Sequence, residues 1–237
     1  MKILGIETAT PLLGVALLSE SDPRFSQERT TISQSSHCEL VNGFIQELIG
    51  RAGFPLEKLD CIAVSIGPGS FTGLRIGIAS AMGLAYGLGK PVAPVSTLMA
   101  LAWPVSKPGS LVCPLIDAKR GEAYAAIYRV NPPELPEPVM EPAVLPVSKL
   151  VEKIIALGEP VMFTGPAVSL FGSKLAETIP SYLIGGMELS QPSTLAIAEI
   201  GLVLFKTGKA VSPDQIRPVY LRRSDAEIAR DARHQRC

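Results

Sequence analysis

The sequence has little charge and few of the side chains that bind metals. Of its 237 residues, 19% are charged and 5% are aromatic, and the formal net charge at pH 7 is zero. The protein therefore has no net positive charge with which to attract nucleic acid. The two histidines, His37 and His234, are too far apart for an H-x-x-x-H ligand pair, and the carboxylates form no obvious oxygen cage. We expect no metal site.

Cysteine pairs and targeting segments are missing as well. No C-x-x-C motif is present, and the four cysteines are widely separated: Cys38, Cys61, Cys113 and Cys237. This spacing predicts free thiols rather than a disulfide framework or a zinc site. Glu7 interrupts the first apolar run, and the uncharged stretch between Arg75 and Lys90 is short and rich in glycine. We therefore expect a cytoplasmic protein with no secretion signal and no membrane contact.

Apolar residues are abundant, at 47% of the chain, so a sizeable core can form in one large domain or two small ones. The apolar run 61–66 predicts a buried strand, and a Gly-Pro-Gly turn follows it. Ser70 or Thr72 can cap the next helix, and Gly89 can end it. Ser70 could also be a nucleophile, but no G-x-S-x-G elbow surrounds it, so we favour the cap.

Small residues recur every four positions along that helix, at Gly73, Gly77, Ala81 and Ala85. They form one nearly bare ridge, and each glycine costs a helix about 1 kcal/mol relative to alanine. A second backbone is therefore expected to lie very close. The turn before the helix could instead cradle a phosphate, but neither the P-loop pattern nor the G-x-G-x-x-G spacing is present. Close packing of the helix on its own sheet is the simpler interpretation.

A weak internal repeat opens each half of the chain. Residues 3–6 predict a strand that ends at Glu7, and residues 14–18 predict the returning strand. Residues 111–128 repeat this pattern of strand, acid, turn and strand, with Asp117 as the acid. Two such hairpins indicate two α/β lobes that face a cleft. The two acids could form a pair across that cleft, or each could stabilise its own turn.

Residues 36–49 predict an amphipathic helix that begins with a capping box of Ser36 and Glu39. Its wide apolar stripe consists of Leu40, Val41, Phe44, Ile45, Leu48 and Ile49. This helix either packs on its own sheet or turns part of its apolar face towards a partner.

Prolines and a glycine between residues 104 and 109 mark a linker, which divides the chain into lobes 1–107 and 108–237. The last helix or the tail could pack back on the N-terminal lobe.

We expect strands at 92–95 (at a sheet edge because of Pro94), 161–164 and 182–184, and helices at 97–102, 148–157, 168–177 and after Ser193 as far as Gly208. Residues 131–146 contain six prolines and predict an extended surface loop. The Arg-rich tail is either a solvated helix or an RNA-touching patch.

Several motifs together resemble one family. ILGIETAT, HCELV, GPGSFTGLRIG, IDAKRGEAY and PVYLR are similar to the bacterial TsaB (YeaZ) family, and the resemblance spans nearly the whole chain. It implies the actin-like ATPase (ASKHA) superfold, an α/β fold of two lobes, each a mixed sheet flanked by helices. That fold agrees with the duplicated hairpins.

The resemblance also implies a function. Family members are non-catalytic scaffold subunits in the synthesis of N6-threonylcarbamoyladenosine (t6A) at position 37 of tRNA. They bind and activate a TsaD-like transferase, work with a TsaE-like ATPase, reach tRNA through the complex, and form homodimers when alone. The catalytic paralogue's metal-binding H-x-x-x-H pair matches Thr97 and Leu101, which cannot replace it. Its nucleotide loop has only a poor counterpart at residues 164–166, where Pro166 lacks an N–H donor.

We therefore expect no catalytic residues, no metal and no tightly bound cofactor, with weak nucleotide binding at Glu7, Thr8 and Thr10 as the one cofactor prediction. The resemblance places the partner interface on two helices, with these residues: His37, Leu40, Val41, Phe44, Leu48, Phe71, Gly73, Leu74, Gly77, Ile78 and Ala81. The alternatives are an independent ATPase, a glycoprotease-like hydrolase, or a tRNA-binding module that uses the Arg-rich tail.

Overall fold

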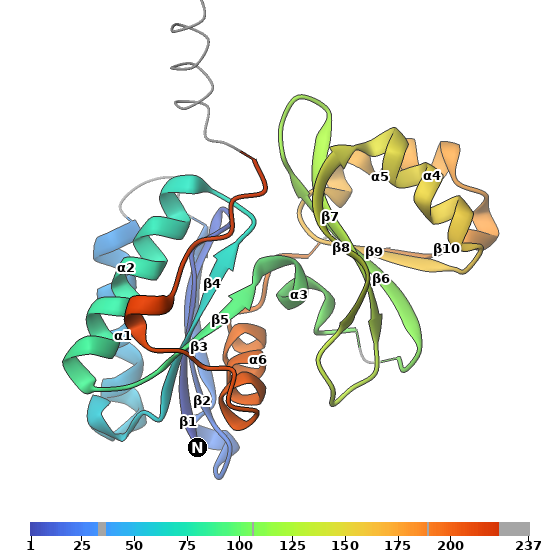
Figure 1. The fold of residues 1–237 in the computed structure, drawn as a ribbon. Coiled ribbons are helices and arrows are strands. Elements are labelled where there is room, and N and C mark those ends of the chain that lie inside the picture. The colour runs from blue at the N-terminus through green and yellow to red at the C-terminus, as the bar shows by residue number, and fades with distance from the viewer. Residues whose placement is uncertain (33–36, 106, 189, 223–237) are drawn as a thin grey trace, which may run out of the picture.

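The chain forms two lobes, each built on one five-stranded sheet (Figure 1). The structure, a computed structural model, describes residues 1–32, 37–105, 107–188 and 190–222. Both sheets mix parallel and antiparallel pairs and carry helices. The predicted fold class, two lobes that are each a mixed sheet flanked by helices, is confirmed.

The N-terminal sheet has the strand order β3-β2-β1-β4-β5. Its strands are β1 (Lys2–Glu7), β2 (Leu12–Ser19), β3 (Gln27–Ile32), β4 (Cys61–Gly67) and β5 (Val92–Ser96). The first three strands form antiparallel hairpins, and β4 and β5 continue the sheet in parallel with β1. Strand β5 lies at an edge, where the missing N–H of Pro94 costs the sheet no ladder bond.

Helices cover both faces of this sheet because its inner strands β1, β2 and β4 are apolar on both sides. Helices α1 (His37–Ala52) and α2 (Phe71–Leu88) pack on the face that carries Leu4 and Ile6. The opposite face, which carries Ile3, packs against α6 (Thr194–Lys206) and α3 (Thr97–Ala102). Alternate residues of β1 therefore face different helices, as the period of a strand requires.

Helix α6 comes from the second half of the sequence but packs on the N-terminal lobe. It contacts β1, β2 and β4, and glycines make the approach close. A Cβ built on Gly5 would lie 2.8 Å from the Thr194 carbonyl oxygen, and one on Gly201 would overlap the Ala63 side chain. The Trp103 indole N–H donates to a carboxylate oxygen of Glu199 at 2.6 Å, which ties the residue after α3 to α6.

The C-terminal sheet has the order β10-β9-β6-β7-β8. Its strands are β6 (Ser110–Asp117), β7 (Glu122–Val130), β8 (Glu137–Pro146), β9 (Val161–Thr164) and β10 (Ile184–Glu188). Helices α4 (Val147–Leu157) and α5 (Val168–Thr178) pack on one face, and α3 packs on the other. Helix α3 therefore lies between the two lobes (Figure 1).

Two local predictions are wrong. The proline-rich stretch 131–146, predicted to be a surface loop, contributes β8, an edge strand that pairs with β7 through two irregularities in register. Proline is tolerated there because an edge strand leaves one row of backbone groups unpaired. The strand predicted at 182–184 is instead a 3-10 turn, Ser181–Leu183, and β10 follows it.

The ends of α2 are as predicted. The Ser70 hydroxyl accepts a hydrogen bond from the Gly73 N–H at 3.2 Å, and Gly89 ends the helix in the left-handed conformation with φ of 64°. Further short 3-10 helices occur at Pro23–Phe25, Leu56–Lys58 and Pro213–Gln215. The capping box predicted for α1 includes Ser36, which lies outside the described residues.

Candidate functional sites: the inter-lobe cleft and the two-helix face

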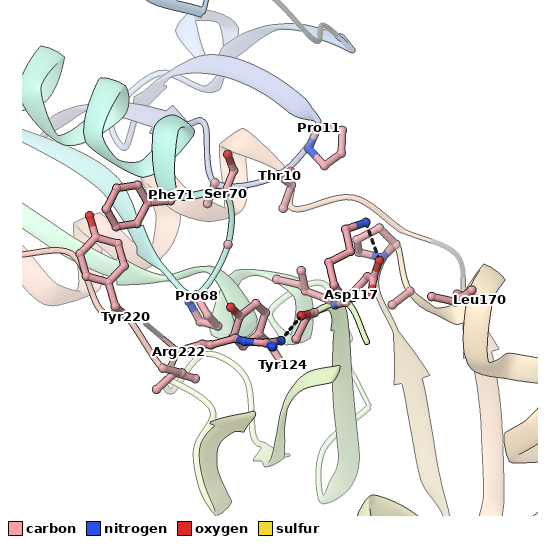
Figure 2. Close-up of a pocket in the computed structure, with 18 of the residues that line it drawn as sticks. Thr10, Pro11, Pro68, Ser70, Phe71, Asp117, Tyr124, Leu170, Tyr220 and Arg222 are labelled. Atoms are coloured by element: carbon pink, nitrogen blue, oxygen red, sulfur yellow. Dashed lines mark hydrogen bonds and ion pairs between the residues drawn. The ribbon is translucent and has the colours of Figure 1, made fainter. Parts of the chain in front are cut away.

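A cavity of about 760 Å³ lies between the lobes (Figure 2). The N-terminal lobe supplies the β1–β2 turn with Thr10 and the β4–α2 loop with Ser70. The C-terminal lobe supplies Asp117 at the end of β6 and the first turn of α5, and residues 219–222 complete the wall. The cavity is large enough for a small-molecule ligand.

Glu7 stabilises the β1–β2 turn from a fully buried position. Its Oε1 atom accepts hydrogen bonds from the N–H groups of Ala9 at 2.7 Å and Thr10 at 3.1 Å. Burial raises the pKa of the Glu7 carboxyl to about 7, because desolvation of the charged form outweighs the hydrogen bonds that lower it. Glu7 is not among the residues that line the cavity.

Of the three residues predicted to contact a nucleotide, only Thr10 lines the cleft. Thr8 is fully buried, and its hydroxyl donates to the Gly73 carbonyl oxygen at 2.8 Å. Glu7 and Thr8 could therefore affect a ligand in the cleft only indirectly, by positioning the β1–β2 turn.

Asp117 also stabilises a turn, but at the surface of the cleft. Its Oδ1 atom accepts from the Lys119 N–H at 2.7 Å, and its Oδ2 atom pairs with the Lys119 ammonium at 2.7 Å. Lys119 and Arg120 both have positive φ, at 65° and 57°, which few residues other than glycine adopt. Since Glu7 lies outside the cavity, the two acids do not face each other as a pair, and the turn-stabilising interpretation holds for both.

The other candidates for chemistry already have structural roles. Thr97 and Leu101 are buried in α3, and the Thr164 hydroxyl donates to the Leu101 carbonyl oxygen at 3.2 Å. Cys61 and Cys113 are free and buried, and burial raises the pKa of the Cys61 thiol to about 12. Among the described residues, no group of three or more His, Cys, Asp or Glu side chains could hold a metal.

Most of the predicted partner interface faces inwards. Eight of its eleven residues are buried within this chain: Val41, Phe44, Leu48, Gly73, Leu74, Gly77, Ile78 and Ala81. A Cβ on Gly73 would overlap the Thr8 carbonyl oxygen, and one on Gly77 would overlap the Thr8 hydroxyl. The bare ridge therefore accommodates the β1–β2 turn of the same chain, and the simpler interpretation, close packing within the lobe, is correct for it. Leu40 and Phe71 are partly exposed, and the His37 side chain lies outside the description.

The opposite side of the same two helices is open and also built from small residues. We call it the outer face; it consists of Gly43 and Gly50 on α1 and Ala79, Gly83, Tyr86 and Gly87 on α2. A Cβ built on any of its four glycines would have no described atom outside its own helix and its chain neighbours within 4 Å. Tyr86 is 57% exposed. Nothing in the described chain explains these glycines.

Helix α2 is unusually apolar for a helix with so much exposed surface. Its 18 residues are long and apolar enough to cross a membrane by length and composition, yet only 33% of them are buried. The buried side packs on β4 and α1, which accounts for only part of its apolar character. The exposed part of α2 includes its four outer-face residues, and at the start of the helix Arg75 stands over the Phe71 ring at 3.9 Å.

Sequence reasoning missed one part of the cleft. Residues 216–222, which we call the strap, run along α2 and supply one wall of the cavity. The Tyr220 ring stacks on the Phe71 ring with centroids 4.7 Å apart, and Arg222 reaches the β6–β7 turn (Figure 2). The only signal was the PVYLR motif, because arginines near a chain end also fit a solvated tail.

Known proteins resemble this chain along nearly its whole length. A family model described as TsaD, tRNA N6-adenosine threonylcarbamoyltransferase, matches residues 29–230. The tRNA threonylcarbamoyladenosine biosynthesis protein TsaB of Bacillus subtilis strain 168 is 30% identical over 228 residues, which cover 96% of each chain. TsaB of Escherichia coli K12 is 31% identical over 230 residues, covering 95% of this chain and 96% of that one. The structure of YeaZ from Pseudomonas aeruginosa has a TM-score of 0.77 and 26% identity, and covers 93% and 99% of the two chains.

The paired mixed sheets with a cleft between them define a two-lobed protein of the actin-like ATPase (ASKHA) superfold. Within that class, the extent and identity of these matches show that the chain belongs to the TsaB family, also called YeaZ. The resemblance drawn from GPGSFTGLRIG and its companion motifs is therefore confirmed.

Proposed function

We propose that this protein is a non-catalytic subunit in the synthesis of t6A at position 37 of tRNA, where it binds and activates a TsaD-like transferase. Its relatives in Bacillus subtilis and Escherichia coli are named as tRNA threonylcarbamoyladenosine biosynthesis proteins, which supports the pathway. In this proposal a TsaE-like ATPase completes the complex in the cytoplasm, tRNA is reached through the complex, and the isolated chain forms a homodimer.

The outer face is the observation that carries this proposal. Four helical glycines cost a folded chain about 1 kcal/mol each relative to alanine, and no described atom outside the helix and the chain neighbours lies within 4 Å of a Cβ built on any of them. Small residues let the backbone of a second helix approach closely, and exposed Tyr86 is a suitable anchor beside them. We therefore keep the predicted pair of helices as the partner site, but we now propose that the contact residues are those of the outer face and not those of the buried ridge.

A matched pair of substitutions tests the outer face. Ala79→Glu places a charge on the outer face of α2, and Ala156→Glu makes the same change at an exposed position of α4 in the other lobe. We expect Ala79→Glu to weaken binding to the cognate TsaD-like protein at least about tenfold, because a carboxylate would lose its water in the contact, and Ala156→Glu to have no effect. Isothermal titration calorimetry measures both affinities.

An activity assay tests the pathway itself. Threonylcarbamoylation of tRNA is measured with the TsaD-like and TsaE-like proteins, with each component omitted in turn. We expect the rate to fall when this chain is omitted and to fall with Ala79→Glu. A rate that does not depend on this chain would refute the functional proposal, and unchanged affinity in Ala79→Glu would refute the assignment of the face.

The cleft supports a second candidate, an independent ATPase, because its volume suits a nucleotide. Thr10 and Asp117 would lie beside such a ligand. Our proposal expects weak or no nucleotide binding by the isolated chain. Magnesium-dependent ATP turnover by the purified protein, abolished by a bulky residue at Thr10, would favour the enzyme instead.

A further inference from the structure

The described chain ends by crossing from one lobe to the other. After the 3-10 turn Pro213–Gln215, the strap runs along α2 towards the cleft (Figure 1). Its last four residues form part of the cavity wall, and Figure 2 shows Tyr220 beside Phe71 and Arg222 below it. A segment in this position touches both lobes and the space between them.

The N-terminal lobe holds the strap through backbone and ring contacts. The Val219 N–H donates to the Ile66 carbonyl oxygen at 2.7 Å, beyond the point where β4 stops pairing with β1. Gly67 has φ of 117°, and a Cβ there would lie 2.6 Å from the Val219 carbonyl oxygen, so the strap lies very close to the strand end. The Arg75 Nε–H donates to the Tyr220 hydroxyl at 3.3 Å, which adds to the ring stack.

Within the described part of the chain, the Arg222 side chain makes the strap's hydrogen bond and ion pair with the C-terminal lobe. The Arg222 guanidinium donates from Nη1 to the Ala118 carbonyl oxygen at 2.8 Å and lies 3.3 Å from a carboxylate oxygen of Glu122. The Arg222 side chain is only 18% exposed, so solvent screens these contacts less than a surface ion pair. Both partners belong to the β6–β7 turn, 100 or more residues earlier in the chain.

We propose that the strap is a clasp that holds the lobes together across the cleft, and that Arg222 fastens it. The strap's contacts with Ile66 and Phe71 belong to the N-terminal lobe, so Arg222 makes its polar connection to the C-terminal lobe. Release of Arg222 frees the β6–β7 turn from the strap and widens the entrance beside Asp117. Access to the cleft is thus controlled by the strap, independently of the partner proposed above.

Hydrogen exchange of the full-length protein tests the clasp with a matched control. Arg222→Ala removes the fastening, while Arg217→Ala removes the same charge from a strap residue whose guanidinium donates to the carbonyl oxygens of Asp214 and Ile216, on its own side of the strap. We expect amides of residues 117–122 and of Val219 to exchange about tenfold faster in Arg222→Ala, the factor set by one charge-assisted hydrogen bond. Amides of α4 and α5 should not change, and Arg217→Ala should match the wild type.

A milder variant, Glu122→Gln, keeps the bond to Ala118 and removes only the ion pair. It should accelerate the same amides by a smaller factor, and it keeps the proposal testable if Arg222→Ala does not fold. Exchange in both variants indistinguishable from Arg217→Ala would overturn the clasp. Equal acceleration in α4 and α5 would overturn it too, because it would indicate general destabilisation.

Discussion

The two sides of helix α2 have similar composition and opposite environments. On the inner side Gly73 and Gly77 are buried under the β1–β2 turn, where a Cβ would overlap Thr8 atoms. On the outer side Gly83 and Gly87 have open space around them. The same four-residue spacing therefore has two causes. On the inner side the β1–β2 turn of the same chain lies close to the helix, and on the outer side, in our proposal, another chain does.

The comparison shows what small-residue spacing can and cannot tell. A glycine every fourth residue indicates that some backbone lies close to that side of a helix. It does not identify that backbone, because a turn 65 residues earlier leaves the same pattern as a partner protein. Substitutions on the two sides should therefore have opposite effects on the stability of the isolated chain.

The largest effect is expected on the inner side. Gly73→Ala should lower the free energy of unfolding by at least about 3 kcal/mol, because the new methyl group meets backbone, which cannot rotate away. Urea unfolding followed by circular dichroism measures the change. A loss below 1 kcal/mol, the range of a tolerated surface substitution, would mean that the turn is not held against α2.

The second prediction concerns the turn that the inner side contacts. The folded-state pKa of Glu7, about 7, exceeds its ordinary value of 4.5. Between these values the unfolded chain releases the proton that the folded chain keeps, so stability falls as pH rises and levels off above about pH 7. Over this interval the loss is about 3 kcal/mol, because each pKa unit corresponds to 1.36 kcal/mol.

Glu7→Gln should remove this loss, since an amide oxygen still accepts from Ala9 and Thr10 and carries no charge. The variant should therefore be more stable than the wild type at pH 8 and about equally stable near pH 4.5, as measured by urea unfolding at both values. Asp117→Asn is the control, because that carboxyl is partly exposed in the equivalent turn of the other lobe. If the free energy of unfolding changed with pH by the same amount in the wild type and in Glu7→Gln, folding would not raise the pKa of Glu7.

Much of the fold was predictable from the sequence because short-range rules decide it. Alternating apolar runs, the Ser70 cap and the Gly89 terminus of α2 all act within a few residues. The position of β8 was not predictable in this way, because six prolines argue against a strand unless the strand is known to lie at an edge. Likewise, the destination of α6 depends on Gly5, which lies against Thr194 and Ala198, and on Gly201, which lies against Ala63, and these contacts form only in three dimensions.

The candidate sites were likewise predictable only in part from the sequence. The motif around Gly73 predicted α2 with its Ser70 cap, as the structure has it, and Thr10 lines the cleft, while the partner role of α2 stays a prediction. Sequence spacing did not reveal that Gly73 and Gly77 lie against the Thr8 turn, because it does not show which side of α2 that turn occupies. Arg222 was missed because its partners, Ala118 and Glu122, are distant in sequence, and the IDAKRGEAY motif that contains them does not show what they contact.

The smallest effect is expected on the outer side. Gly83→Ala should raise the free energy of unfolding by about 1 kcal/mol, because alanine favours helix and the added methyl group meets no described atom outside its own helix and its chain neighbours within 4 Å. The same methyl group should weaken association with the TsaD-like protein, so stability and binding change in opposite directions. Measuring unfolding at two protein concentrations separates the effect on the chain from any effect on a homodimer. A destabilised Gly83→Ala at low concentration would mean that the outer face is already occupied within the chain, and the contrast between the two sides of α2 would fail.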